Sequence, residues 1–320
     1  MLLLTAYVFI IGLCLGSFAN VVIYRLPLII FVRDWRRHSD PDDRRELLEI
    51  IDEDPARARE KLNAAMAQNL NIATTRSRCP RCGRVLGVRE LVPVLSWLLQ
   101  GGKCRGCGGR IAARYALVEL LCGLAAAAVW LRFGLVGDWV SLALYELVTL
   151  LLVILTFIDL DYRILPNELT YSGMVLGLLA ALAPHYPWSD QTLHLAGLGE
   201  ALLGLLVAGG LSRAIYELGS RMYGREVYGM GDVKLMCMLG LLLGWKLGLL
   251  TLVLANCYGA FFGVAMVMLS SLLQRLKLQW MPAVTLKSMV PFGPYIVFAA
   301  FTVILAGPEL ITGYQNFMEL

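Results

Sequence analysis

Two aspartates lie where a membrane disfavours charge, each at one end of an apolar run. Asp159 closes such a run and Asp232 opens another. An ionised side chain beside hydrocarbon costs several kcal/mol, so its usual role is functional and it usually has a partner. If the two carboxylates meet, they share one proton; the ionised member can deprotonate water while the protonated one polarises a peptide carbonyl. The pair predicts aspartic-protease chemistry. The alternative is two unrelated interfacial acids, each salt-bridged or reaching toward water.

The residues around each aspartate indicate how it is positioned. Asp159 and Asp161 are two residues apart, so on a helix they point roughly 200° from one another. We expect Asp159 to face a bundle interior, and Asp161 to lie nearer water and to pair with Arg163 or a backbone donor. Asn167 suits a helix N-cap, which predicts a tight elbow over 159–167. The two glycines in Gly229-Met230-Gly231-Asp232 permit close backbone approach. That four-residue pattern is weak by itself and more specific beside a second intramembrane aspartate.

A second chemical feature is a cluster of four cysteines. Cys79 and Cys82, and then Cys104 and Cys107, form two C-x₂-C pairs separated by 21 residues. Four thiolates complete a closed tetrahedral zinc site, which leaves no open position for water or substrate. The sequence therefore predicts a structural zinc ion. The remaining cysteines are expected to be small buried hydrophobes within spans: Cys14, Cys122, Cys237 and Cys257.

The composition identifies the elements that must position these groups. The chain has 320 residues, is 58% hydrophobic and has a mean hydropathy of +0.67. These values are typical of an all-α polytopic membrane protein. We predict about eight transmembrane helices, from runs long enough to cross a bilayer: 2–24, 115–133, 139–158, 169–184, 193–216, 233–250, 251–273 and 291–310.

The distribution of charge predicts the orientation of these spans. The first span has no basic residue before it and Arg25 after it, so it is not a cleaved signal and its C-terminal end is expected in the cytoplasm. Of 28 Lys and Arg residues, only Arg132 and Lys246 then fall on the outer side. Both aspartates are thus predicted at the cytoplasmic face. The expected cytoplasmic segments are 25–114, 159–168, 217–232 and 274–290.

The same distribution defines the expected domains and excludes one class of partner. We expect transmembrane helix 1 over 1–24, a small cytoplasmic zinc-binding domain over 25–114, inserted between helices 1 and 2, and a membrane domain of about seven helices over 115–320. The polar stretch 40–68 predicts one or two solvated helices. The net charge of +4 is an orientation signal, and no basic stripe with aromatic support indicates nucleic-acid binding.

Several motifs together resemble the bacterial type IV prepilin peptidases, which are GxGD-type intramembrane aspartic proteases. The resemblance covers nearly the whole chain outside about 28–78. Ala116 stands where that family usually has proline, and Asn167 where it usually has aspartate. The motifs, in chain order, are Gly16–Pro27, the two cysteine pairs with Leu91–Leu98 between them, Arg114–Leu120, Ile158–Asp161, Leu165–Asn167, Gly229–Leu235 and Pro291–Tyr295.

The resemblance implies a bifunctional enzyme of the bacterial inner membrane. Such enzymes cleave the basic leader of prepilins or type II secretion pseudopilins at the cytoplasmic face. They then methylate the new N-terminus with S-adenosylmethionine. By match to the motifs, Asp159 and Asp232 are the catalytic residues, and Cys79, Cys82, Cys104 and Cys107 hold the zinc.

The methyl-donor site is poorly defined by the sequence, which contains no Gly-rich loop in a strand-turn-helix context. Asn20 and Glu119 are polar groups near spans, and a structural hydrogen bond is as good an interpretation for each as cofactor binding. Two rival functions remain. One is an ion- or proton-coupled transporter with a relay of Glu146, Asp159, Glu200 and Asp232, for which no internal repeat is visible. The other is a zinc-containing membrane scaffold without catalysis.

Overall fold

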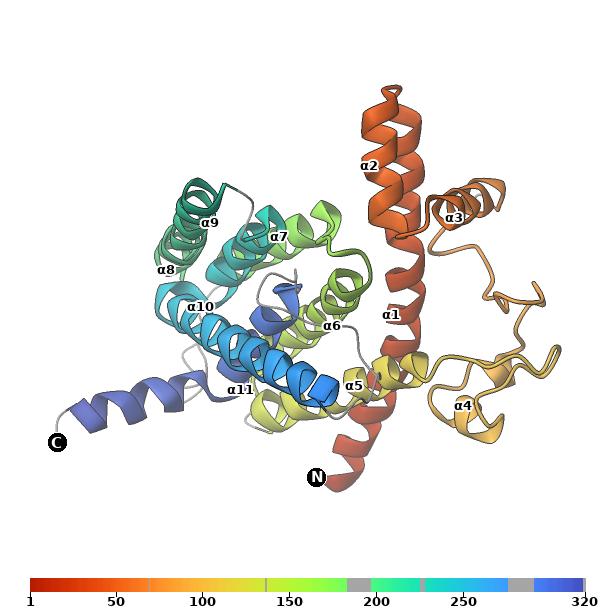
Figure 1. Cartoon of the computed structure of the whole chain (residues 1–320). Coiled ribbons are helices and arrows are strands. Elements are labelled where there is room, and N and C mark those ends of the chain that lie inside the picture. Colours follow the sequence, from red (N-terminus) through yellow and green to blue (C-terminus); the bar gives the residue numbers. More distant parts are fainter. Residues whose placement is uncertain (69, 136, 183–196, 225–227, 276–290, 319–320) are drawn as a thin grey trace. The chain divides into compact units, whose positions relative to one another are not determined.

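The computed structural model describes residues 1–320 except 69, 136, 183–196, 225–227, 276–290 and 319–320. Every regular element within the described residues is helical, as predicted (Figure 1). The chain forms two compact units, Met1–Ile164 and Leu165–Leu320.

The first unit is built on α1 (Leu2–Arg37), α5 (Arg114–Val129) and α6 (Trp139–Tyr162). A π-helical turn, Trp130–Gly134, extends α5. Helices α1 and α5 pack closely because small residues lie between them. A Cβ placed on Gly16 would stand 2.7 Å from the Cα of Glu119. Such close backbone approach is typical of helix pairs in membranes.

Helix α1 continues well past the predicted end of the first span at residue 24. The charged Arg25 does not end the helix, because its guanidinium donates to the carbonyls of Asn71 (2.9 Å) and Ile72 (3.3 Å). Two further helices, α2 (Pro41–Ile51) and α3 (Pro55–Ala67), confirm the prediction of helices within 40–68. They are amphipathic and only partly solvated. Their apolar sides form a small core with α1 that includes Phe31, Leu48, Ile51 and Leu62.

The second unit is arranged around α10 (Met230–Arg275), which contacts α7 (Asn167–Leu182), α8 (Leu198–Gly204), α9 (Gly210–Tyr223) and α11 (Gly293–Met318). A π-helical turn, Leu205–Gly209, joins α8 to α9.

Helix α10 is interrupted at Gly244, whose φ of 76° and ψ of 178° lie outside the helical region. A Cβ on Gly248 would stand 3.3 Å from the Cα of Gly240. Residues eight apart in a straight helix are separated by about 12 Å, so the chain turns back on itself here. The predicted division between two spans at 250/251 was therefore misplaced, because glycine tolerates the positive φ that the reversal needs.

Six described helical stretches are long and apolar enough to cross a membrane: Leu2–Arg37, Arg114–Gly134, Trp139–Tyr162, Leu198–Tyr223, Met230–Ser271 and Gly293–Asn316. They overlap seven of the eight predicted spans; two of these, 233–250 and 251–273, fall on Met230–Ser271, and the first of the two runs through the reversal at Gly244. The remaining one, 169–184, corresponds to α7, which has 16 residues. Residues 183–184, 193–196 and most of 274–290, on which parts of the predictions fall, lie outside the described residues.

Gly204 gives a direct test of the packing in the second unit. A Cβ at this position would stand 2.0 Å from the carbonyl oxygen of Gly240, so α8 and α10 would have to separate. We expect Gly204→Ala to destabilise the protein by at least about 2 kcal/mol, measured by thermal unfolding in detergent. Gly199→Ala, on the same helix with open space around it, is the matched control and should be neutral or slightly stabilising. Equal behaviour of the two variants would contradict the packing.

Candidate metal centre and buried carboxylates

The two cysteine pairs lie in two turns of the same construction. The amide of Cys79 donates to the carbonyl of Arg84 (2.9 Å), and that of Cys104 to the carbonyl of Gly109 (2.8 Å). In each turn the glycine after the second cysteine, Gly83 or Gly108, has a positive φ near 68° and donates to the carbonyl of the first cysteine. Isolated antiparallel bridges, Arg78 with Val85 and Lys103 with Arg110, flank the turns. Each turn therefore directs two thiols toward one point.

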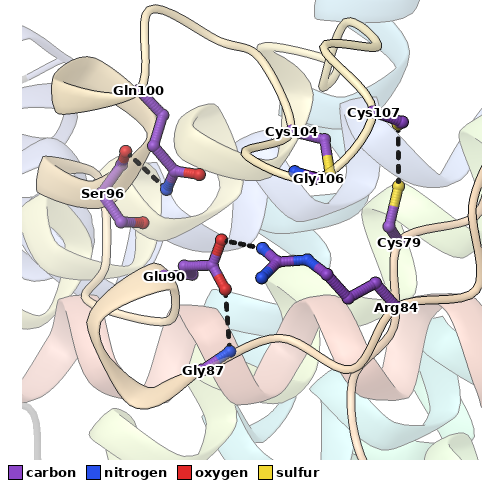
Figure 2. Close-up of polar contacts among 9 residues, drawn as sticks. All are labelled: Cys79, Arg84, Gly87, Glu90, Ser96, Gln100, Cys104, Gly106 and Cys107. Carbon is purple, nitrogen blue, oxygen red and sulfur yellow. Dashed lines mark hydrogen bonds and ion pairs between the residues drawn. The ribbon is translucent and has the colours of Figure 1, made fainter.

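The four sulfur atoms form a cluster suited to a tetrahedral metal ion. They all lie within 4.8 Å of one another, and the Sγ atoms of Cys79 and Cys107 are 4.0 Å apart (Figure 2). Zinc bound by four thiolates at 2.3 Å would need sulfur separations of about 3.8 Å. The cluster therefore fits the predicted ion with little movement. Cys79 and Cys104 are buried, whereas Cys82 and Cys107 are exposed.

Backbone amides prepare the cluster for a cation. The amides of Cys107 and Gly106 stabilise the thiolate of Cys104 and lower its pKa to about 6. The distance from the Gly106 nitrogen to this sulfur is 3.4 Å. The thiolate is the form that binds zinc, so this lowered pKa favours metal binding by Cys104, whereas the pKa of Cys82 in the same cluster is raised to about 11.

The first turn is held by an ion pair of its own. Arg84 pairs with Glu90, whose other carboxylate oxygen accepts from the amide of Gly87 at 2.9 Å (Figure 2). These contacts lower the pKa of Glu90, the Gly87 amide having the largest effect. Next to this turn lie a short 3₁₀ helix, η1 (Val88–Glu90), and α4 (Leu95–Leu99).

The other four cysteines only partly follow the prediction of burial. Cys122 is buried and Cys237 is intermediate, but Cys14 and Cys257 are exposed on the surfaces of α1 and α10. In an apolar span a small thiol is compatible with a lipid-facing position as well as with a protein core. Composition could not distinguish these two environments.

Asp159 is 5% exposed and lies in the last turn of α6. The helix persists through Asp161, so the two carboxylates point in different directions, as expected. Asp161 lies at the surface, but its partner is Arg114 (2.6 Å) and not Arg163. Arg114 also donates to the carbonyl of Phe157 at 3.1 Å. Arg163 instead ends the helix in the left-handed conformation, with φ 55°.

Asp232 is 6% exposed and is the third residue of α10. Its carboxylate accepts from the amide of Gly229 at 3.3 Å, and its own amide donates to the Gly229 carbonyl at 3.1 Å. Asp232 thus makes the contact of the third residue in a capping box, with Gly229 at the N-cap position, and the helix dipole favours a negative charge there. Gly231 permits close packing, since a Cβ on it would stand 3.0 Å from that of Leu165.

Lys234 fixes the turn that carries Asp232, a role that the sequence did not indicate. Its ammonium donates to the side-chain oxygen of Asn167 at 2.6 Å and lies 5.6 Å from the ring centre of Tyr171. The first turns of α7 and α10 are thus joined. Asn167, which we expected at the N-cap, is the first residue of α7. Of the predicted elbow over 159–167, only residues 163–166 are non-helical.

Asn20 and Glu119 both make structural hydrogen bonds. The amide of Asn20 donates to the carbonyl of Tyr115 at 3.0 Å, and Glu119 accepts from the amide of Val94 at 2.7 Å. The second of these contacts joins the cysteine-containing segment to α5.

Comparison with known proteins gives matches over most of the chain. Residues 10–133 match the bacterial peptidase A24 N-terminal domain, and residues 146–264 match the type IV leader peptidase family. The chain is 35% identical over 316 residues to a prepilin leader peptidase/N-methyltransferase of Aeromonas hydrophila, covering 97% of this chain and 94% of that protein. The chain belongs to the type IV leader peptidase family.

Two further relatives of the same description extend the similarity. One, from Stutzerimonas stutzeri, is 35% identical over 97% of this chain and 93% of its own. Another, from Pseudomonas aeruginosa, is 34% identical over 96% of this chain and 91% of its own. No solved structure matches the chain. Membership of this family confirms that the chain is an enzyme, and with the six apolar stretches it is consistent with a multi-pass protein of the bacterial inner membrane.

Proposed function

We propose that this chain cleaves the basic leader of type IV prepilins or type II secretion pseudopilins and then methylates the new N-terminus with S-adenosylmethionine. The observation that carries the proposal is the burial of one aspartate at the end of α6 and of another at the start of α10, both within residues 146–264, which match the type IV leader peptidase family. A membrane helix end with a buried acid needs a functional reason.

The proposed chemistry assigns complementary roles to the two carboxylates. When Asp159 and Asp232 approach each other, one proton is shared between them. The ionised member takes a proton from the attacking water, while the protonated member polarises the scissile carbonyl. The capping contacts at Gly229 and the Lys234–Asn167 bond fix the orientation of Asp232. The hydrogen bond from Arg114 to the carbonyl of Phe157 fixes the turn that carries Asp159.

The proposed substrate matches a site at the cytoplasmic membrane face. A prepilin consists of an apolar helix with a short cationic leader, so its scissile bond lies at the cytoplasmic boundary of the bilayer. The apolar helix would pack among the spans. We further propose that the chain crosses the membrane eight times, with α7 and the two parts of α10, before and after Gly244, each crossing it.

The cysteine cluster would hold a structural zinc ion through Cys79, Cys82, Cys104 and Cys107. Bound zinc would crosslink the two turns of the cytoplasmic domain, 25–114, which has little apolar core near the cysteines. The methyl donor would supply the methyl group for the new N-terminus, and no residue of this chain is assigned to its pocket.

One assay tests both reactions. Purified full-length enzyme is mixed with a prepilin and with S-adenosylmethionine that carries a labelled methyl group. We expect a shortened pilin that carries the label on its N-terminal residue. A prepilin left at full length by zinc-loaded, folded enzyme would overturn the proposal. A shortened but unlabelled pilin would retain the peptidase and remove the methyltransferase.

A further inference from the structure

The segment between the two cysteine turns exposes an unusual number of large apolar side chains. Leu91–Leu99 contains no charged residue. Its most exposed members are Leu98, at 59%, and Leu99, at 73%. Together with η1, the segment presents one apolar surface, which we call the apolar wedge. It consists of Val88, Leu91, Val92, Leu95, Leu98 and Leu99.

The wedge is attached to the membrane helices well inside the membrane boundary. The amide of Val94 donates to Glu119, which lies five residues into α5, or about 7.5 Å along its axis. Glu119 in turn lies against Gly16 of α1. Gly16 precedes Arg25 by nine residues, which corresponds to about 13 Å of helix on the apolar side of that charge. The backbone at Val94 is therefore at the depth of the spans.

The backbone of this segment is suited to such a place. Val94 has φ 58° and ψ −52°, and the amide of Leu95 donates to the carbonyl of Pro93, which together form a classic γ-turn. Irregular backbone at membrane depth is tolerated only where its polar groups are satisfied within the protein. Pro93 has no amide hydrogen, Leu95 bonds within the turn, and Glu119 accepts from Val94. These contacts satisfy the amides at the centre of the wedge.

We propose that the apolar wedge is embedded in the bilayer, so that the cysteine-containing domain is anchored to lipid by α4 and its flanking residues. The occupant of this surface is phospholipid, because Val94 joins the segment to Glu119 of a predicted membrane helix and Leu91–Leu99 carries no charge. Trp97, which is part of α4, ties this helix to the rest of the domain, because its indole nitrogen donates to the carbonyl of Ile111 at 3.1 Å. The cysteine turns, with Arg81, Arg105 and Arg110, would then lie at the level of the headgroups.

Depth measurements on the full-length protein test the proposal. A ketone-bearing amino acid at Leu99 is coupled to a nitroxide, which avoids the native cysteines, and the protein is placed in phosphatidylethanolamine/phosphatidylglycerol vesicles. Leu124, a lipid-facing residue of α5 that is 53% exposed, serves as the hydrocarbon reference. Asn63, exposed on α3, serves as the aqueous reference. Unchanged zinc content shows that each labelled protein has folded.

We expect oxygen to relax the nitroxide at Leu99 several-fold more effectively than a water-soluble nickel complex does, as at Leu124. The opposite preference is expected at Asn63. A label at Leu99 that behaves like the one at Asn63 would place the wedge in water and overturn the proposal. Protection from both reagents would also overturn it, since protein would then cover the surface, either a substrate helix or a second copy of the chain.

Discussion

Asp159→Asn and Asp232→Asn should each reduce leader cleavage by at least about 100-fold, the lower range of what one acid–base group contributes to catalysis. Asparagine has nearly the shape of aspartate but can neither accept a proton from water nor share one with the opposite carboxylate. Both positions are buried, and asparagine keeps the volume and packing of the aspartate that it replaces. The variants should therefore accumulate in the membrane as the parent does. Cleavage is measured by the mobility shift of a prepilin in detergent.

Three further acids serve as controls for this prediction. Asp161→Asn removes a surface carboxylate whose pairing with Arg114 is worth about 1 kcal/mol or less. Glu146→Gln and Glu200→Gln remove the acids that a transporter relay would need. All three should cleave at a rate close to the parent's. Retained cleavage in both buried-aspartate variants would refute the two-aspartate mechanism, and loss of cleavage in all five would indicate a general structural effect.

Cys79→Ser and Cys104→Ser should each release the zinc ion and loosen the domain that contains it. Both thiols are buried, at 7% and 4% exposure, and a structural zinc site contributes about 10 kcal/mol or more of binding free energy at neutral pH. We expect zinc content, measured by mass spectrometry of the purified protein, to fall from about one ion per chain to near zero. Limited proteolysis should then cut within 77–110.

Cys257→Ser is the matched control for the cysteine variants. It replaces an exposed thiol on α10, far along the chain from the cluster, and should leave both zinc content and proteolysis unchanged. Parent-like zinc content in the Cys79 and Cys104 variants would contradict a four-thiolate site.

The sequence predicted those features that depend on local pattern. The C-x₂-C spacing was enough to predict that the four cysteines meet at one site, because each turn closes within six residues. Helical geometry separated Asp159 from Asp161, and hydropathy located most of the spans. All of these follow from short-range periodicity.

The features that the sequence did not predict depend on partners distant along the chain. Arg114 reaches Asp161, Lys234 reaches Asn167, and Glu119 accepts from Val94. Arg25 was taken as the end of a span, yet its helix continues, because backbone carbonyls from a later loop solvate the charge. The reversal at Gly244 was missed for a related reason. One glycine in an apolar run has no pattern of its own until Gly240 and Gly248 are seen to meet.

The continuation of α1 to Arg37 has a mechanical consequence. Twelve helical residues follow Arg25, so α1 extends about 18 Å beyond that residue. The α2–α3 pair packs along this extension. The stretch is helical throughout, with Pro27 as the one residue that lacks a backbone amide donor, so the height of the pair follows the tilt of α1 and any bend at Pro27. One residue inserted after Arg25 would turn α2 and α3 by about 100° around the axis. The orientation of α2 and α3 therefore follows the tilt and rotation of the first apolar helix.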